Sequence, residues 1–238
     1  MDAVRVQTLR KSKGLASAYS EGAYRSGAHT GLLAGVAAGT ATAGHIWTAR
    51  WAPAATDYRK KAVLQRLRVR WFTIAGFTAA QEVGLELFRL TAYTVAYSGG
   101  TGAAALTPSA KSSAFPASLM AGRISGSDAL TAGTQTLDTD PIGAASFAEL
   151  AAAATVPKGA FEIFLSTEDL DRHPIILAPN EGLVLRNLVA MGAGGTARVT
   201  VEMDWLEVGA TDAVGRSATA QGRLSSRGST DRTRDGVR

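Results

Sequence analysis

The feature that most constrains the fold is a series of segments in which apolar and polar residues alternate. The clearest is "ARVTVEMDWLEV" at residues 197–208, whose large apolar side chains share one face: Val199, Val201, Met203 and Trp205. A period of two residues is that of a β-strand with one buried face. The segment is therefore predicted to be the strand that closes a β domain.

Similar segments recur along the chain from His45 onward. They are "HIWTARW", "AVLQRLRVRWF", "QEVGLELFRLTAYTVAY", "LMAGRISG", "ALTAGTQTLD", "AFEIFL", "PIILA" and "GLVLRNLVA". One short helix is expected in "AASFAELAAAA", where Ser146 and Glu149 have capping-box spacing. About nine short strands with turn residues between them predict an all-β fold. We expect a jelly-roll-like antiparallel β-sandwich with extended N- and C-terminal arms.

Composition divides the chain into three parts. Residues 45–209 hold the strand pattern and are predicted to form the sandwich as one domain. Residues 1–44, rich in Gly, Ala and Ser, are expected to be an extended arm because they bury too little to offset their ordering entropy. Residues 210–238 are expected to form a second arm, which is basic and polar.

Positive charge is concentrated in these two arms, while the part between them is close to neutral. The residues expected to contact partners are Arg5, Arg10, Lys11, Lys13, Arg216, Arg223, Arg227, Arg232 and Arg234. Such arms bind either acidic surfaces of neighbouring proteins or packaged nucleic acid through charge alone. The aspartates interspersed among the arginines favour protein neighbours, and no specific nucleic acid contact is expected.

A stripe of arginines in the second long segment suggests a strand pairing. Val63, Leu67, Val69 and Trp71 are placed on one face and the arginines on the other. An antiparallel hairpin with its turn near Gly76 sets Arg70 opposite Glu82 and Arg66 opposite Glu86. Opposite charges across such a pair contribute roughly 0.2–1 kcal/mol each. The stripe is therefore interpreted as structural, with a phosphate-binding face as the alternative.

No catalytic or cofactor motif is present, and neither a cofactor nor a metal ion is expected. The chain has no cysteine, and His29, His45 and His173 lie too far apart in sequence for a ligand motif. The loop residues Glu168, Asp169, Asp171 and His173 are interpreted as solvated, with calcium binding as the alternative. Residues 27–49 carry no formal charge but consist mainly of small residues, so neither a membrane helix nor a cleaved signal is expected.

Several segments together resemble a family of structural proteins from tailed-bacteriophage virions. They are "HIWTARWAP", "LQRLRVRWFTIAGFTAAQEVGLELFRLTAYT", the "GGT" that follows, "ALTAGTQTLDTDPI" and "HPIILAPNEGLVLRNLVAMGAGGTARVTVEMDWLEV". The likeness covers about residues 45–208 and is a pattern of spaced apolar and turn residues. It implies location in the virion and a role as a capsid-decoration or tail-associated protein.

From these observations we expect a non-enzymatic decoration or cement protein that clamps neighbouring capsid subunits through its arms. The expected partners are the major capsid protein or portal and tail proteins, in addition to copies of the chain itself as a small oligomer, a trimer. An alternative is a tail, neck or head-fibre component that binds host glycan through Trp51, Tyr93 or Tyr97. A depolymerase using Asp138 and Glu162 is the third hypothesis, although nothing in the sequence marks either carboxylate as perturbed.

Overall fold

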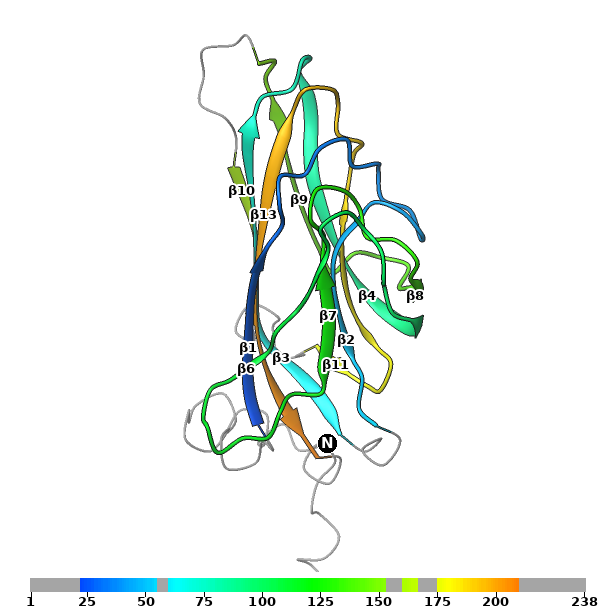
Figure 1. Ribbon diagram of the computed structural model, residues 1–238, viewed down its shortest axis with the longest axis vertical. Coiled ribbons are helices and arrows are strands. Elements are labelled where there is room, and N and C mark those ends of the chain that lie inside the picture. Colours follow the sequence, from blue (N-terminus) through cyan, green and yellow to red (C-terminus); the bar gives the residue numbers. More distant parts are fainter. Residues whose placement is uncertain (1–21, 55–59, 153–159, 167–174, 210–238) are drawn as a thin grey trace, which may run out of the picture.

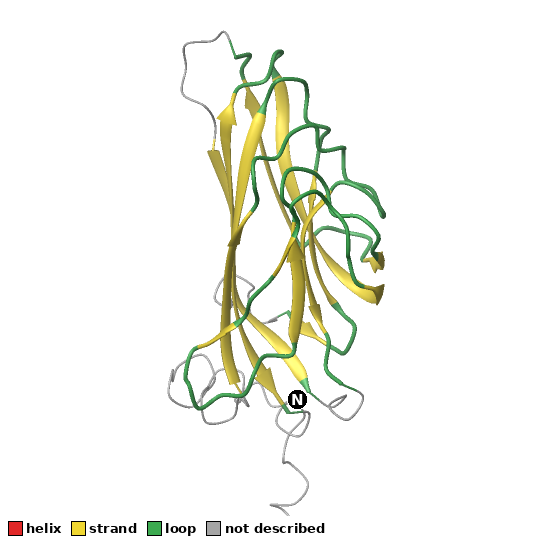
Figure 2. Ribbon diagram, in the orientation of Figure 1, coloured by secondary structure: helices red, strands yellow, loops and turns green. Residues whose placement is uncertain are grey.

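A computed structural model describes residues 22–54, 60–152, 160–166 and 175–209. These residues form strands and loops, with no helix among them (Figure 2). The strands are β1 (Gly22–His29), β2 (His45–Trp51), β3 (Lys61–Ala75), β4 (Gln81–Val95), β5 (Ala104–Ala105), β6 (Ser109–Ala110), β7 (Met120–Ile124), β8 (Thr134–Leu137), β9 (Gly143–Glu149), β10 (Ala160–Ser166), β11 (Ile176–Leu177), β12 (Gly182–Asn187) and β13 (Thr196–Val208).

The strands form two antiparallel sheets that face each other (Figure 1). Sheet A has the order β10-β3-β13-β1-β6, and β11 also pairs with β3. Sheet B has the order β5-β7-β2-β12-β4-β8, and β9 also pairs with β4. The predicted β-sandwich is therefore confirmed, while its jelly-roll connectivity stays a prediction.

The space between the sheets is filled by large apolar side chains. Four tryptophans are fully buried there: Trp47, Trp51, Trp71 and Trp205. The alternation read in the closing strand is confirmed, since its four large apolar residues lie in the core while Arg198 is exposed. These side chains give a rigid body because interiors of this kind are closely packed.

A bulge in β3 changes which side chains face the core. Opposite Asp204 and Trp205 of β13, the partners on β3 are Arg66 and Leu64, so Gln65 is an additional residue. An additional residue reverses the inward and outward alternation. The assignment of Val63 to the buried face was therefore wrong, because Ala62 and Leu64 are buried there instead.

The sandwich begins before residue 45, which corrects the predicted arm of residues 1–44. Strand β1 pairs along its whole length with β13, from Gly22 opposite Glu207 to His29 opposite Thr200. Leu33 and Val36, which follow it, are buried in the main core. Their burial shows that this Gly- and Ala-rich segment contributes to the domain despite its composition.

The predicted hairpin between the two long strands is also wrong. Strand β3 belongs to sheet A and β4 to sheet B, so the connection between them crosses from one sheet to the other. Arg66 therefore does not pair with Glu86, nor Arg70 with Glu82, which is exposed opposite Ala148. Each long strand has a core-facing side, and placing the strands in opposite sheets brings those two sides together.

The short helix expected around Ser146 and Glu149 is replaced by strand β9. This strand pairs with β4 from Glu149 opposite Gln81 to Gly143 opposite Leu87. Alanine favours helices, but the preference is weak and tertiary pairing overrides it. The Glu149 carboxylate is buried and accepts a hydrogen bond of 2.9 Å from the Thr73 hydroxyl, which links the two sheets.

Loops cover the outer side of sheet B with a second, smaller core. Its buried members are Phe88, Leu90, Tyr93, Tyr97, Leu130 and Val184. The loops lie on this side of the sandwich in Figure 1, to the right of β2 and β4. His45 belongs to the same layer, where its Nε2 donates to the Thr40 carbonyl at 3.0 Å and its Nδ1 accepts from the Tyr97 hydroxyl. Burial lowers the pKa of His45, which keeps the ring neutral.

A buried carboxylate fastens the loop before β7 to the end of β13. Glu207 Oε1 accepts hydrogen bonds from Ser118 Oγ at 2.6 Å, Leu119 N at 3.0 Å and Trp205 Nε1 at 3.3 Å. Burial raises the pKa of Glu207 above its ordinary value, although these donors act in the opposite direction. The desolvation of the charged form therefore outweighs its hydrogen bonds.

We expect the free energy of unfolding of Glu207→Gln, relative to the unaltered chain, to increase with pH. The folded chain holds the Glu207 proton above the unfolded pKa of about 4.3, so its contribution to stability is greatest below that pH. The contribution is lost as the pH rises through the folded pKa, and a glutamine does not titrate. Urea unfolding of both proteins at pH 4, 5.5 and 7 tests this; a difference independent of pH would contradict it.

Candidate interaction face

The outer side of sheet A is the part of the sandwich surface that the described loops leave open over most of its length (Figure 1). On β3 it presents Arg66, Arg68 and Arg70. The pairing of β3 with β13 places Asp204, Glu202 and Thr200 of β13 beside these arginines. On the next strand, β1, Arg25, Gly27 and His29 lie opposite the same three residues of β13. We call this surface the sheet A face.

Four ion pairs cross the sheet A face. Nε of Arg68 and Nε of Arg70 lie 2.7 Å and 3.0 Å from the same oxygen of Glu162 on β10. The hydrogen bond from Arg68 is the main cause of the lowered pKa of Glu162. Nε of Arg66 and Nζ of Lys111 lie 2.9 Å and 3.1 Å from the two oxygens of Asp204. The interpretation that acids compensate the arginine stripe is correct, but the acids come from β10 and β13.

Positive charge remains in excess on this face. It carries seven cationic side chains, namely Arg25, Lys61, Arg66, Arg68, Arg70, Lys111 and Arg198, against the carboxylates of Glu162, Glu202 and Asp204. Within the described ranges, Arg25 and Arg198 have no carboxylate within salt-bridge distance. Two of the cations are therefore available to an external anion.

Large apolar side chains are exposed among these charges. Phe72 and Ile74 follow Arg70 on the outer side of β3 and are 40% and 44% exposed. Phe164 on β10 lies opposite Arg68 and is 45% exposed. Arginine and aromatic side chains are enriched at protein interfaces and dominate their binding energy. The composition of the sheet A face is thus that of a binding surface.

The lower end of the face contains a concavity of about 350 Å³ lined by Arg25, Arg66, Ala110, Lys111 and Asp204. Asp204 lies directly opposite Arg25 in the pairing of β13 with β1. Three cations thus surround one carboxylate. Neither the sequence spacing nor any motif indicated this cluster, because its members come from four distant segments that the sheet brings together.

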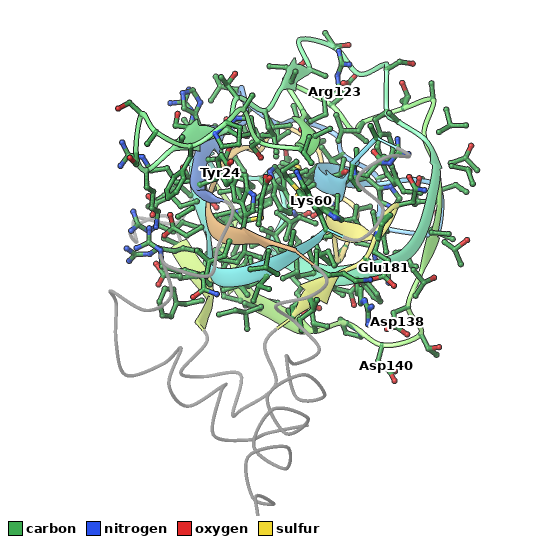
Figure 3. All side chains as sticks on the ribbon, turned by 90° about the horizontal axis from the view of Figure 1, so that it is seen from below. Tyr24, Lys60, Arg123, Asp138, Asp140 and Glu181 are labelled. Atoms are coloured by element: carbon green, nitrogen blue, oxygen red, sulfur yellow. The ribbon has the colours of Figure 1, made fainter. Side chains whose placement is uncertain are left out.

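The proposed carboxylate pair does not form an active site. Asp138 follows β8 at the edge of sheet B, whereas Glu162 lies on β10 of sheet A. Figure 3 shows Asp138 and Asp140 pointing outward, on the side of the sandwich away from Tyr24 of β1. Glu162 is held ionised by its arginines, which is the wrong state for a proton donor.

The structure excludes the expected glycan-binding aromatics, whereas the acidic loop and the cations of the two arms lie outside the described residues. Trp51, Tyr93 and Tyr97 are all buried and offer no exposed platform for a sugar. Glu168, Asp169, Asp171 and His173 lie outside the described residues, as do the cations expected in the arms: Arg5, Arg10, Lys11, Lys13, Arg216, Arg223, Arg227, Arg232 and Arg234. In the part that the structure describes, no group of three metal-ligating side chains is present.

Comparisons with protein-family models, curated proteins and solved structures give no match. Within the described ranges, the chain has no helix of the length and hydropathy needed to cross a membrane.

Proposed function

We propose that this chain is a non-enzymatic structural protein of a phage virion, a decoration or cement protein that holds neighbouring capsid subunits together. The observation that carries the proposal is the difference between the two outer sides of the sandwich. Loops and a second core cover the outer side of sheet B, whereas the described residues leave the sheet A face open, with arginine and phenylalanine side chains on it. A rigid body with one open binding side is suited to attachment on a larger assembly.

The resemblance to virion structural proteins supports the same proposal. The segments that carry it supply β2, β3, β4, β8 and β11–β13, which include the central strands of both sheets. In the proposed role, the cations of residues 1–21 and 210–238 contact neighbouring proteins, in addition to the sheet A face. Repetition of such contacts by particle symmetry makes many weak contacts add up.

The test compares purified particles assembled with and without this chain. Particles that lack it are expected to release their DNA at a lower temperature, and adding the purified chain back is expected to restore the original release temperature. Mass spectrometry of the purified particles establishes whether the chain is present. Its absence from particles, or an unchanged release temperature, would contradict the proposal.

A further inference from the structure

We propose that the sheet A face binds an acidic protein surface, one carboxylate of which enters the concavity between Arg25, Arg66 and Lys111. The inference concerns the binding surface of the chain and holds whether or not the partner is a capsid protein. It rests on charge, on exposed apolar area and on the ion-pair geometry of the face.

The geometry of the concavity favours an external carboxylate. Both oxygens of Asp204 are already engaged, one by Arg66 at 2.9 Å and the other by Lys111 at 3.1 Å. Arg25, across the strand pair, has no carboxylate partner within the described residues. Arginine donates in a planar fork that suits a carboxylate. A carboxylate entering here therefore gains Arg25 without displacing Asp204.

The extent of the face is adequate for a protein partner. Strands β10, β3, β13 and β1 have 7, 15, 13 and 8 residues. At about 3.3 Å per residue and about 4.8 Å between strands, they cover roughly 700 Å². A standard protein interface buries about 800 Å² on each partner. Phe72, Ile74 and Phe164 would then form the apolar part of the contact, with the arginines around it.

The charges on the sheet A face favour an acidic protein surface over a second copy of the chain or a nucleic acid. A second copy docked through the same face would bring together two surfaces that each carry seven cations and three carboxylates, and the repulsion between their net positive charges opposes this. A nucleic acid backbone would meet Glu162, Glu202 and Asp204 among the arginines, and these carboxylates repel phosphate. An acidic protein surface can place its own cations against those three carboxylates and its acids against Arg25 and Arg198.

The test uses the full chain and two fluorescent probes, poly-L-glutamate and a peptide of alternating Glu and Leu, at physiological salt. The face variant combines Arg25→Gln and Arg198→Gln, which breaks no described ion pair. The matched control combines Arg50→Gln and Arg123→Gln, which removes the same charge from strands β2 and β7 of sheet B. Neither arginine has a carboxylate within salt-bridge distance among the described residues. We expect the face variant to weaken binding of both probes at least tenfold and the control to weaken it less than twofold.

A third variant, Phe164→Ser, tests the apolar part of the contact. It is expected to weaken binding of the Glu and Leu peptide several-fold and to leave binding of poly-L-glutamate unchanged. A loss of probe binding in the control alone, or equal losses in both charge variants, would overturn the proposal. So would tighter binding of a 20-base-pair DNA duplex that is lost in the face variant, because the partner would then be a nucleic acid. Since no particle is involved, failure here is distinguishable from failure of the proposed virion role.

Discussion

A chain that begins at residue 45 is expected not to fold cooperatively, whereas one that begins at residue 22 is expected to unfold like the full chain. The first deletion removes β1 and exposes the edge of β13 that it covers. It also removes Tyr24, which stacks on Trp205 with ring centroids 5.8 Å apart, and the buried Leu33 and Val36. The second deletion removes no described contact.

The size of the effect follows from burial. Fully burying a large apolar side chain contributes about 1.5–3 kcal/mol, so three such residues contribute roughly 5–9 kcal/mol. The total stability of a domain is about 5–15 kcal/mol. Urea unfolding followed by circular dichroism checks the prediction. A cooperative transition with an unchanged midpoint in the shorter chain would show that residues 22–44 are the arm that their composition indicates.

The sequence could not reveal β1 because its pattern lacks large residues. In "GAYRSGAH", Tyr24 is the one large apolar side chain, and the alternating positions around it are Gly, Ser and Ala. The periodicity that identifies strands depends on contrast between apolar and polar residues. The signal here was Tyr24 itself, an aromatic residue in a small-residue segment. Its burial depends on Trp205 of β13, which lies opposite it and comes 181 residues later in the chain.

The sequence predicted that carboxylates neutralise the arginine stripe, but it could not predict which strands supply those carboxylates. An arginine stripe with alternate spacing fits any strand that carries acids with matching spacing. The stripe is compensated by Glu162 and Asp204, while Glu86 pairs with Arg186 at 2.7 Å in sheet B. Cross-strand charge pairs stabilise a register once two strands are neighbours. They do not determine which strands become neighbours, because burial of the core-facing sides decides that.

The concavity of the sheet A face could not be predicted from the sequence either. Arg25, Arg66, Lys111 and Asp204 come from four strands or loops spread across the chain. Each looks like an ordinary surface charge in the sequence. Only the order β3-β13-β1-β6 places them side by side. A binding surface made by pairing of distant strands leaves no local motif, whereas a catalytic loop or metal site often does.

Trp71→Ala is expected to lower the free energy of unfolding by about 3–5 kcal/mol, the range for replacing a buried tryptophan or phenylalanine with alanine. Trp71 is fully buried and stacks on Phe161 with centroids 5.9 Å apart. Its Nε1 donates to the Thr73 hydroxyl at 3.0 Å, and Thr73 in turn donates to Glu149 of the opposite sheet. The substitution therefore leaves a cavity and weakens a link between the sheets.

The next residue provides the matched control. Phe72 points to the other side of β3 and is 40% exposed, so Phe72→Ala is expected to change the free energy of unfolding by less than about 1 kcal/mol. Both variants lose an aromatic ring from the same strand, and only the buried one removes core volume. Urea midpoints with unchanged slopes measure the two effects. Because Phe72 lies on the sheet A face, Phe72→Ala should instead weaken partner binding. Equal losses of stability in Trp71→Ala and Phe72→Ala would mean that the face is buried and cannot be a docking surface.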